Sequence, residues 1–361
     1  MRVRMILDSA PMPPGSPRIL LVRLSHLGDV VHALPVFHAL RARYPRAEIA
    51  WAVQTEFASL VEGLPGLARV IRFERHEGFA AFGKVWRELR GFGADWAIDA
   101  QGNGKSAAVT LASLAPRRSG YAREDWQEPF ASGILTDSAP RSRAAHVLER
   151  TRALCGWVAG TDELRRDPAL SENERAAGRE WLAREFPESS LPFCIVHLAR
   201  AGDPRSWPHD NASRWISATL AHGSAVLALS GPAEAGELAE LELRHSQSPH
   251  FRHWHGQGDL RALASVLSAA AERGARYLGC DSGPLHLAES CGLDVLCLAG
   301  PQDELRTGPF TGRSLRSEFP PPCAPCRERS CSHPRGPVCM SELTAERAAA
   351  AFRARASSRA P

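Results

Sequence analysis

A short apolar run followed at once by a helical pattern, over residues 18–44, constrains this chain most. Ile19 to Leu24 is apolar except for Arg23, and an apolar run of that length without a helical period is typical of a strand buried in a parallel sheet. Residues 25–28 break the run, and from residue 30 onward apolar residues recur at helical spacing. The stretch therefore predicts a strand, a tight turn and a helix, the unit from which open α/β sheets are built.

Asp29 stands where that helix should begin, at the N-cap position. An aspartate there can be an N-cap and no more, worth about 1 kcal/mol through one hydrogen bond and the helix dipole. Because open α/β sheets bind their ligands at the carboxyl ends of the strands, the same carboxylate can instead be a general base directed at a substrate. This stretch alone leaves both interpretations open.

The alternation of apolar runs and helical patterns continues along the chain and predicts two Rossmann-like halves. The expected strands are residues 19–24, 48–54, 69–73 and 96–100 in the first half, and 193–198, 225–230, 276–280 and 294–299 in the second. The expected domains are a loose extension (1–17), a first domain (18–170), a connection (171–190), a second domain (191–340) and a C-terminal helix with its tail (341–361).

Several classes of protein are excluded or disfavoured by what the sequence lacks. Neither half has Gly-x-Gly-x-x-Gly after its first strand and no Walker A motif occurs, so an NAD enzyme or a P-loop ATPase is not expected. No run of about 18 apolar residues is present, and the first 17 residues do not resemble a secretory signal. The net charge is only +4 and the arginines are spread out, so no nucleic-acid partner is expected. We therefore expect a cytoplasmic protein.

The richest stretch of the second half follows Cys280, where a strand is expected to end. Pro284 is well placed for the first turn of a helix, which leaves the N–H groups of Ser282 and Gly283 at the helix N-terminus. Such a terminus is a ready site for a diphosphate, and His286 would face the same opening. An ordinary capped helix is the alternative.

Two further loops follow expected strands of the second half. Arg200 and Arg205 lie in the first of these loops, and Glu234 lies in the second. An arginine beside a helix N-terminus can hold a leaving diphosphate in a bidentate manner, and a glutamate can bond ribose hydroxyls. A solvated arginine and an ordinary first-turn glutamate are the alternatives.

Six short segments, taken in order, resemble glycosyltransferase family 9, the ADP-heptose:lipopolysaccharide heptosyltransferases. They are residues 25–35, 99–106, 125–129, 149–152, 205–208 and 281–287. The resemblance implies an α/β GT-B fold, in which two Rossmann-like doubly wound domains face a cleft, with the acceptor on the first domain and the donor on the second. It also implies inversion at the sugar without a metal, and the absence of an Asp-x-Asp motif agrees with that.

The resemblance assigns roles to particular residues. Asp29 becomes the expected catalytic base, and Arg205, where the family commonly has lysine, becomes the residue that stabilises the leaving diphosphate. The expected donor-binding residues are Asp281, Ser282, Gly283, His286, Glu234 and Arg200. The expected acceptor-binding residues are Ser25, Gly28, Gln101, Lys105, Arg117, Arg118 and Arg123. The chain departs from its relatives at His26, where they have a small residue, and in a donor loop one residue longer, which leaves the role of Arg200 open.

The implied reaction transfers heptose from ADP-heptose to a Kdo residue of a lipid A precursor, in assembly of the lipopolysaccharide inner core. No cofactor is required, and the protein would dock peripherally on the cytoplasmic face of the inner membrane. Two alternatives remain. One is a family 9 transferase with another acceptor or nucleotide sugar, and the other is a non-catalytic relative that binds a nucleotide sugar.

Four cysteines are grouped near the C-terminus, at Cys323, Cys326, Cys331 and Cys339, with His333 between them. Grouped soft ligands can hold a structural zinc or another metal. The spacing lacks a second Cys-x-x-Cys pair, so a disulfide or unpaired thiols are the alternatives. No metal is expected in catalysis.

Overall fold

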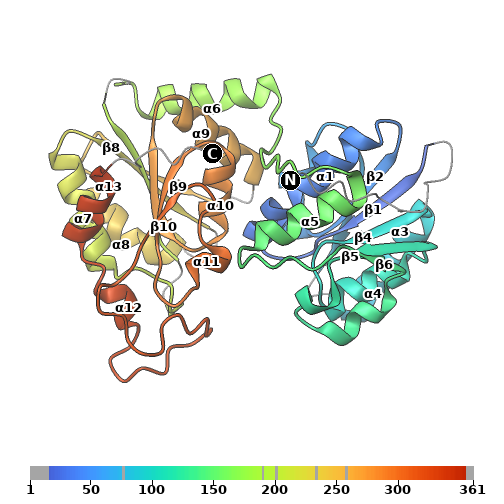
Figure 1. Cartoon of the computed structure of the whole chain (residues 1–361). Coiled ribbons are helices and arrows are strands. Elements are labelled where there is room, and N and C mark those ends of the chain that lie inside the picture. Colours follow the sequence, from blue (N-terminus) through green and yellow to red (C-terminus); the bar gives the residue numbers. More distant parts are fainter. Residues whose placement is uncertain are drawn as a thin grey trace, which may run out of the picture. The chain divides into compact units, whose positions relative to one another are not determined.

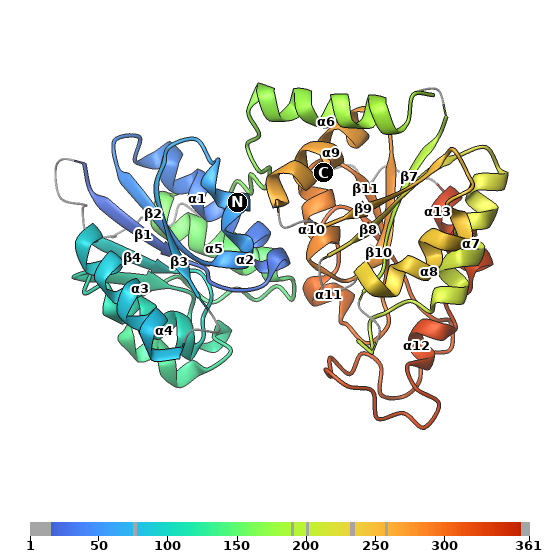
Figure 2. The same cartoon turned by 180° about the vertical axis from the view of Figure 1, so that it is seen from behind.

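The chain divides into two compact units, residues 1–169 and 170–361, each built on its own parallel sheet. The computed structural model describes residues 16–74, 78–188, 191–199, 202–231, 235–256 and 259–354. Each sheet has six strands, and helices flank it (Figures 1 and 2). The expected α/β class, with two Rossmann-like halves, is confirmed.

The first unit has the strand order β3-β2-β1-β4-β5-β6. Its strands are β1 (Arg18–Val22), β2 (Glu48–Gln54), β3 (Leu67–Phe73), β4 (Trp96–Asp99), β5 (Arg117–Gly120) and β6 (Asp137–Ser138). Its helices are α1 (Leu27–Arg43), α2 (Thr55–Glu62), α3 (Gly78–Phe92), α4 (Gly104–Ala112) and α5 (Val147–Ala159), with 3-10 turns η1 (Arg123–Asp125) and η2 (Pro129–Ile134). The strand order reverses between β1 and β4, so the loops that follow these two strands flank the switch point where such sheets bind ligands.

The second unit repeats this plan, with the order β12-β11-β10-β7-β8-β9. Its strands are β7 (Phe193–His197), β8 (Ala225–Ser230), β9 (Phe251–His255), β10 (Arg276–Cys280), β11 (Asp294–Leu298) and β12 (Arg313–Leu315). Its helices are α6 (Glu172–Glu185), α7 (His209–Ala221), α8 (Ala235–His245), α9 (Leu260–Glu272), α10 (Gly283–Ser290), α11 (Glu304–Thr307), α12 (Val338–Ser341) and α13 (Ala345–Arg353). Here the switch point lies between β7 and β10.

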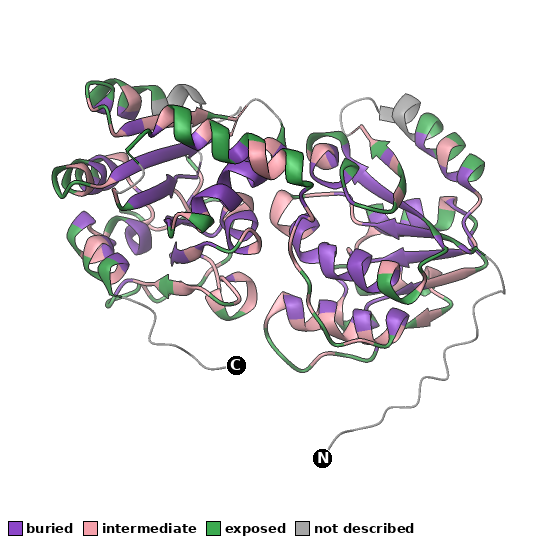
Figure 3. Ribbon diagram, turned by 90° about the horizontal axis from the view of Figure 1, so that it is seen from above, coloured by how far each residue is buried: buried purple, intermediate pink, exposed green. Residues whose placement is uncertain are grey.

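The strands are buried because helices cover both faces of each sheet (Figure 3). In β1, Leu20 and Val22 pack in one cluster with Leu89 of α3 and Val109 of α4. On the other side, α1 packs against α5. Burial on both faces explains why β1 reads as a continuous apolar run rather than an alternating one. No helix in the described part of the chain is long and apolar enough to cross a membrane.

The segment expected to connect the domains differs from that expectation. Residues 172–185 form α6, which packs along α9 within the second unit. The packing is close, since a Cβ atom on Gly178 would lie 2.2 Å from the backbone oxygen of Ser265. Glu174 of α6 also accepts a 2.7 Å bond from Arg261 Nη2 of α9. This segment is therefore part of a folded layer, whereas the expected loose extension at residues 1–17 lies outside the described residues except for its last two.

Candidate active site

Asp29 lies in the first turn of α1, as the third residue of the helix, and not at the N-cap as expected. The N-cap is His26, whose backbone has φ 63° and ψ 127° and whose side chain makes no capping bond. A positive φ at a residue other than glycine is strained, and such strain gathers at functional sites. Asp29, which follows Gly28 in the helix, therefore has no capping role. Its side chain is 41% exposed.

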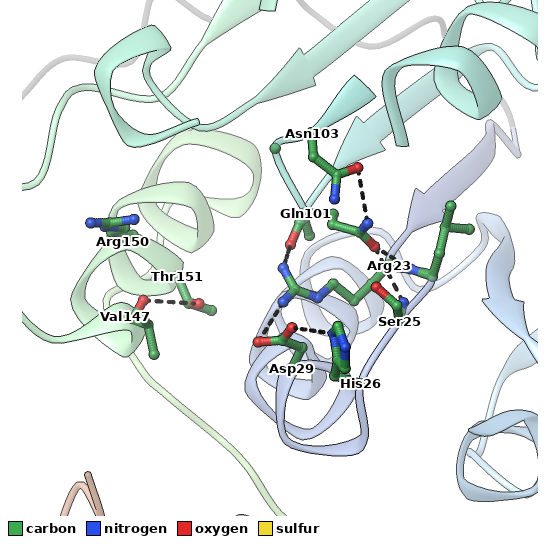
Figure 4. A network of polar contacts seen from close by, with 12 residues as sticks. Arg23, Ser25, His26, Asp29, Gln101, Asn103, Val147, Arg150 and Thr151 are labelled. Carbon is green, nitrogen blue, oxygen red and sulfur yellow. Dashed lines mark hydrogen bonds and ion pairs between the residues drawn. The ribbon is translucent and has the colours of Figure 1, made fainter. Parts of the chain in front are cut away.

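Arg23 holds the Asp29 carboxylate in one orientation (Figure 4). Its Nη2 lies 2.6 Å from Asp29 Oδ1, and its Nη1 donates a 2.6 Å bond to the backbone oxygen of Ala100. The Arg23 side chain is only 11% exposed, so this pair is anchored from the interior of the unit. The other carboxylate oxygen, Oδ2, lies 3.6 Å from His26 Nδ1. The carboxylate thus has one oxygen paired with the buried Arg23 and the other beside the exposed His26.

The surroundings of Asp29 keep it ionised. Desolvation raises the pKa of this carboxyl group, but the charge of Arg23, a hydrogen bond from His26 and the charge of His32 outweigh it. The pKa of Asp29 therefore lies well below its usual range. A carboxylate stabilised in this way is a weak base, so any role in proton transfer depends on its position next to the reacting hydroxyl.

Hydrogen bonds from the loop after β4 hold the loop after β1 in position. Gln101 Oε1 accepts bonds from the backbone N–H groups of Leu24 and Ser25, at 2.7 Å and 3.3 Å. Gln101 Nε2 in turn donates to Asn103 Oδ1 at 3.1 Å, and Asn103 caps α4. The structure therefore brings Ser25 and Gln101 together at the switch point beside Asp29, and Gln101 positions the loop through backbone contacts.

Two of the four cations expected to bind the acceptor lie at the same edge of the sheet as Asp29. Lys105 is exposed as the second residue of α4, after the carboxyl end of β4. Arg123 is exposed in η1, after the carboxyl end of β5. Both side chains are therefore open to an anionic ligand at this edge.

Arg117 and Arg118 do not lie at this edge of the sheet. The register of the sheet corrects the expectation that they lie beside Asp29 with the other acceptor-binding cations. Both residues open β5, and Arg117 pairs with Trp96 at the amino end of β4. Their guanidinium groups are used inside the unit: Arg117 Nε lies 3.1 Å from Asp137 Oδ2, and Arg118 donates to two backbone oxygens at 2.6 Å and 2.7 Å. These two arginines support the far edge of the sheet, away from Asp29.

In the second unit, a buried Asp–His pair lies at the end of β10. His286 Nε2 lies 3.2 Å from Asp281 Oδ1, and Thr307 Oγ1 donates a 2.7 Å bond to Asp281 Oδ2. Ser282 is the N-cap of α10, but its side chain bonds no backbone N–H group of the helix and lies 3.3 Å from His197 Nδ1. Pro284 has no N–H group and that of Leu285 bonds the backbone oxygen of Ser282, so the N–H groups of Ser282 and Gly283 remain for a ligand, as the sequence predicts for a diphosphate site.

Arg205 reaches the same place from the loop after β7. Its Nε and Nη2 bond the two oxygens of Asp203 at 2.9 Å and 2.6 Å, and its Nη1 bonds the backbone oxygen of Asp281 at 3.1 Å. A guanidinium has five N–H groups, so these three bonds leave two for a ligand among the described residues. Hydrogen bonding with Asp203 also raises the pKa of Arg205, so its charge is permanent. Arg205 is therefore aimed at the start of α10.

The remaining expected site residues have different outcomes. Arg200 and Glu234 lie outside the described residues, so their roles stay predictions. The four C-terminal cysteines carry free thiols, and in the described part of the chain no three of their sulfur atoms all lie within 4.8 Å of one another. Desolvation raises the pKa of Cys339 to about 11, with further contributions from Cys326 and Cys331. A metal held by these cysteines also stays a prediction.

Sequence reasoning missed four residues that organise the two sites: Arg23, His197, Asp203 and Thr307. Arg23 did leave a signal, because a lone charge inside a buried apolar run requires a partner. Thr307 and His197 reach the α10 terminus from segments distant in sequence, and nothing in their local sequence indicates that contact.

Comparison with known proteins assigns the chain to a family. The sequence model of glycosyltransferase family 9 (heptosyltransferase) matches residues 82–335. The chain is 29% identical over 334 residues to lipopolysaccharide heptosyltransferase 1 of Pseudomonas aeruginosa, with 88% of each protein covered. It is 26% identical over 299 residues to lipopolysaccharide heptosyltransferase 1 of Escherichia coli, with 79% of this chain and 88% of that protein covered.

Solved structures support the same assignment at the level of the fold. A family 9 glycosyltransferase from Veillonella parvula matches with a TM-score of 0.74 at 18% identity, over 93% of this chain and 97% of that one. An E. coli heptosyltransferase solved with ADP matches with a TM-score of 0.68 at 21% identity, over 92% and 96%. The expected GT-B class of two Rossmann-like domains is confirmed. With the family model matching most of the chain, this protein belongs to glycosyltransferase family 9, the heptosyltransferases, and is a glycosyltransferase.

Proposed function

We propose that this enzyme transfers heptose from ADP-heptose to a Kdo residue of a lipid A precursor, with inversion at the sugar and without a catalytic metal. The observation that carries the proposal is the Asp29 carboxylate, which Arg23 holds by one oxygen at the switch point of the first sheet and whose side chain is 41% exposed. The names of the relatives support the reaction class, since four of them are lipopolysaccharide heptosyltransferase 1. A lipopolysaccharide heptosyltransferase 2 of E. coli is slightly less similar, at 25% identity.

On the acceptor side, Asp29 Oδ2 is the atom that receives the proton. Oδ1 stays bonded to Arg23, which fixes the orientation of the carboxylate. As the acceptor hydroxyl attacks the anomeric carbon, its proton passes to Oδ2, and the bond from that carbon to the diphosphate breaks with its electrons on the phosphate oxygen. Attack from the face opposite the leaving group inverts the anomeric configuration.

On the donor side, the negative charge that develops on ADP is met by fixed positive groups. The two remaining N–H groups of Arg205 and the N–H groups at the start of α10 would bind the diphosphate. Asp281 acts through its neighbours, because its backbone oxygen holds Arg205 and its carboxylate is tied to His286 and Thr307. Glu234 would bind the ribose. In this scheme residues 18–170 carry the acceptor and residues 191–340 the donor.

The acceptor is a membrane lipid, so we propose that the enzyme works peripherally at the cytoplasmic face of the inner membrane. The exposed Phe130 of η2, with 78% of its surface accessible, and Leu111 and Leu114 at the end of α4 support this placement. Exposed apolar side chains on α4 and η2, two elements that contact each other, suit contact with a membrane surface.

Chelation should leave transfer intact. Because the charge on the leaving diphosphate is met by Arg205 and a helix terminus, activity in excess EDTA is expected to equal activity in Mg²⁺ within about twofold. Initial rates of ADP release measured in both buffers test this prediction. A loss in EDTA that Mg²⁺ or Mn²⁺ restores would contradict metal-independent transfer.

Lys105→Ala should raise the KM for the acceptor by about tenfold, because a charge-assisted bond to a carboxylate or phosphate would be lost. ADP affinity should not change, since the donor belongs to the other unit. Kinetics at varied acceptor concentration, together with calorimetric titration of ADP, provide both numbers. The matched control is Arg118→Ala, which removes a cation from the far edge of the same sheet and should leave acceptor KM unchanged in the folded enzyme. Equal effects of the two substitutions would disprove the placement of the acceptor.

A panel of nucleotide sugars tests the proposed function against its alternatives. Under this proposal ADP-heptose is turned over with a Kdo-bearing lipid acceptor, and other nucleotide sugars are poor donors. Turnover of a different nucleotide sugar would make the chain another member of the family. Binding of ADP-heptose without transfer to any lipopolysaccharide acceptor would make it a non-catalytic relative.

A further inference from the structure

A second cluster of ionisable side chains lies on the outer strand of the second sheet, and the transfer reaction does not use it. In the described part of the chain, Glu242, His253 and His255 are the one group of three metal-ligating residues whose ligand atoms all lie within 4.8 Å of one another. Glu242 Oε2 lies 3.2 Å from His253 Nδ1, and Glu242 Oε1 lies 3.3 Å from His255 Nε2. We propose that these three residues bind a divalent first-row transition metal, with Zn²⁺ as the preferred ion.

The local fold explains why the two histidines meet the glutamate. His253 and His255 are two residues apart in β9, so their side chains lie on the same face of the strand. The centroids of the two rings lie 3.9 Å apart, and Glu242 of α8 contacts the rings on that face of the strand. The residue between them, Trp254, faces the other side and packs against Trp181 of α6 at 5.0 Å between ring centroids. The alternation of β9 therefore separates a polar, ligand-bearing face from an aromatic one.

The spacing of the ligand atoms fits a tetrahedral ion. Zinc binds imidazole nitrogen and carboxylate oxygen at about 2.0–2.2 Å, which places neighbouring tetrahedral ligands about 3.3–3.6 Å apart. The distance from His253 Nδ1 to Glu242 Oε2, 3.2 Å, is just below that range, and the distance from His255 Nε2 to Glu242 Oε1, 3.3 Å, is at its short end. Only small side-chain movements are needed to admit the ion. Two imidazoles and one carboxylate favour Zn²⁺, Co²⁺ or Ni²⁺ over Mg²⁺ or Ca²⁺, which prefer oxygen ligands.

Ser230 supplies the kind of support that metal-binding histidines usually have. Its hydroxyl lies 2.8 Å from His253 Nε2, which fixes the ring and directs Nδ1 to the cluster. The His253 side chain is 1% exposed, whereas the side chains of Glu242 and His255 are 39% and 47% exposed. An ion can therefore enter from solvent and keep a water molecule as its fourth ligand.

The site is separate from the proposed diphosphate site. In the second sheet, β9 and β10 are separated by β7 and β8, so three strand spacings of about 4.8 Å place the two strands roughly 14 Å apart. The metal would fasten α8 to the edge strand β9, which otherwise has a neighbour on one side only. Its role is to stabilise the second unit, and the metal takes no part in the transfer.

Titration of the metal-stripped full-length protein with Co²⁺, a spectroscopic substitute for Zn²⁺, tests this proposal. We expect one equivalent to bind with the visible absorption of a four- or five-coordinate ion and without a thiolate-to-cobalt band. Zn²⁺ should displace the Co²⁺. At a free Zn²⁺ concentration 100 times the Kd, the Tm should rise by about 5–10 °C.

Four variants separate this site from other sources of binding. Glu242→Gln keeps the shape of the side chain and His255→Ala changes an exposed position, so both should fold and both should lose at least tenfold in Co²⁺ affinity. His250→Ala removes a nearby histidine that lies outside the cluster and should bind as the wild type does. Absence of one-equivalent binding in the wild type, or binding unchanged in both cluster variants, overturns the proposal. A thiolate band that disappears in a Cys323→Ser, Cys326→Ser, Cys331→Ser variant would assign the metal to the cysteines instead.

Discussion

Replacing Asp29 with asparagine is expected to lower the rate of heptose transfer by about 10²–10⁴-fold, the usual contribution of a general base. Asparagine is nearly isosteric and can still accept a bond from Arg23, so ADP affinity and the fold should be retained. Because the pKa of Asp29 lies well below its usual range, the carboxylate is already ionised at mildly acidic pH. The rate of the wild type should therefore show no loss from protonation of Asp29 between about pH 5 and 8. Single-turnover rates measured across that range provide both comparisons.

A matched control distinguishes loss of the base from loss of an ion pair. Asp137 also pairs with an arginine in the first unit, Arg117, but it lies on β6, the last strand in the sheet order, three strands from β1. Asp137→Asn should lower the Tm and leave the transfer rate of the folded enzyme near that of the wild type. If Asp29→Asn and Asp137→Asn reduce the transfer rate equally, Asp29 supports the fold and is not the base.

Arg205→Ala is expected to lower kcat by about 10²–10³-fold and to weaken ADP binding at least tenfold, because two charge-assisted bonds to the diphosphate would be lost. The same change leaves the Asp203 carboxylate without the guanidinium that now neutralises it, at 2.6 Å and 2.9 Å. That carboxylate would then repel the diphosphate. Calorimetric titration of ADP, combined with steady-state rates, separates effects on binding from effects on the transition state.

Two further substitutions refine this prediction. Arg205→Lys keeps the positive charge, so it should recover part of both losses, although an ammonium cannot make the bidentate contact. Adding Asp203→Asn to Arg205→Ala should recover part of the ADP affinity by removing the repulsion. Unchanged ADP affinity in Arg205→Ala would show that this loop does not bind the diphosphate.

Most of the fold could be predicted because buried parallel strands are long, apolar and regular. The strands at 48–54, 225–230 and 276–280 have the expected bounds. β9 was missed because Phe251–His255 is polar, and an edge strand needs only one neighbour and can leave much of its surface in water. β6 and β12 were missed because they are short, at two and three residues.

The sites were predictable where the sequence places a residue in the loop or the first helical turn that follows a strand. Asp29, Gln101 and Asp281 follow β1, β4 and β10, and the sheet order brings each of them to a switch point. Arg117 and Arg118 were misplaced because the sequence does not show at which end of its short strand a residue lies. β5 begins at Arg117, which puts both arginines at the amino edge.

Contacts between distant segments set the chemistry in ways that the sequence does not reveal. The orientation of Asp29 depends on Arg23, and that of Arg23 depends on the backbone oxygen of Ala100. The Asp281 carboxylate depends on Thr307, 26 residues further along the chain. The contacts with Ala100 and Thr307 join groups that only the folded sheet brings within bonding distance.

The mass of a Kdo-bearing lipid A acceptor after incubation with ADP-heptose and the purified enzyme tests the central claim most directly. The account predicts that the acceptor gains one heptose per molecule, that one ADP is released for each heptose gained, and that EDTA does not prevent it. An acceptor of unchanged mass, under conditions in which the enzyme is folded and binds ADP-heptose, would contradict it.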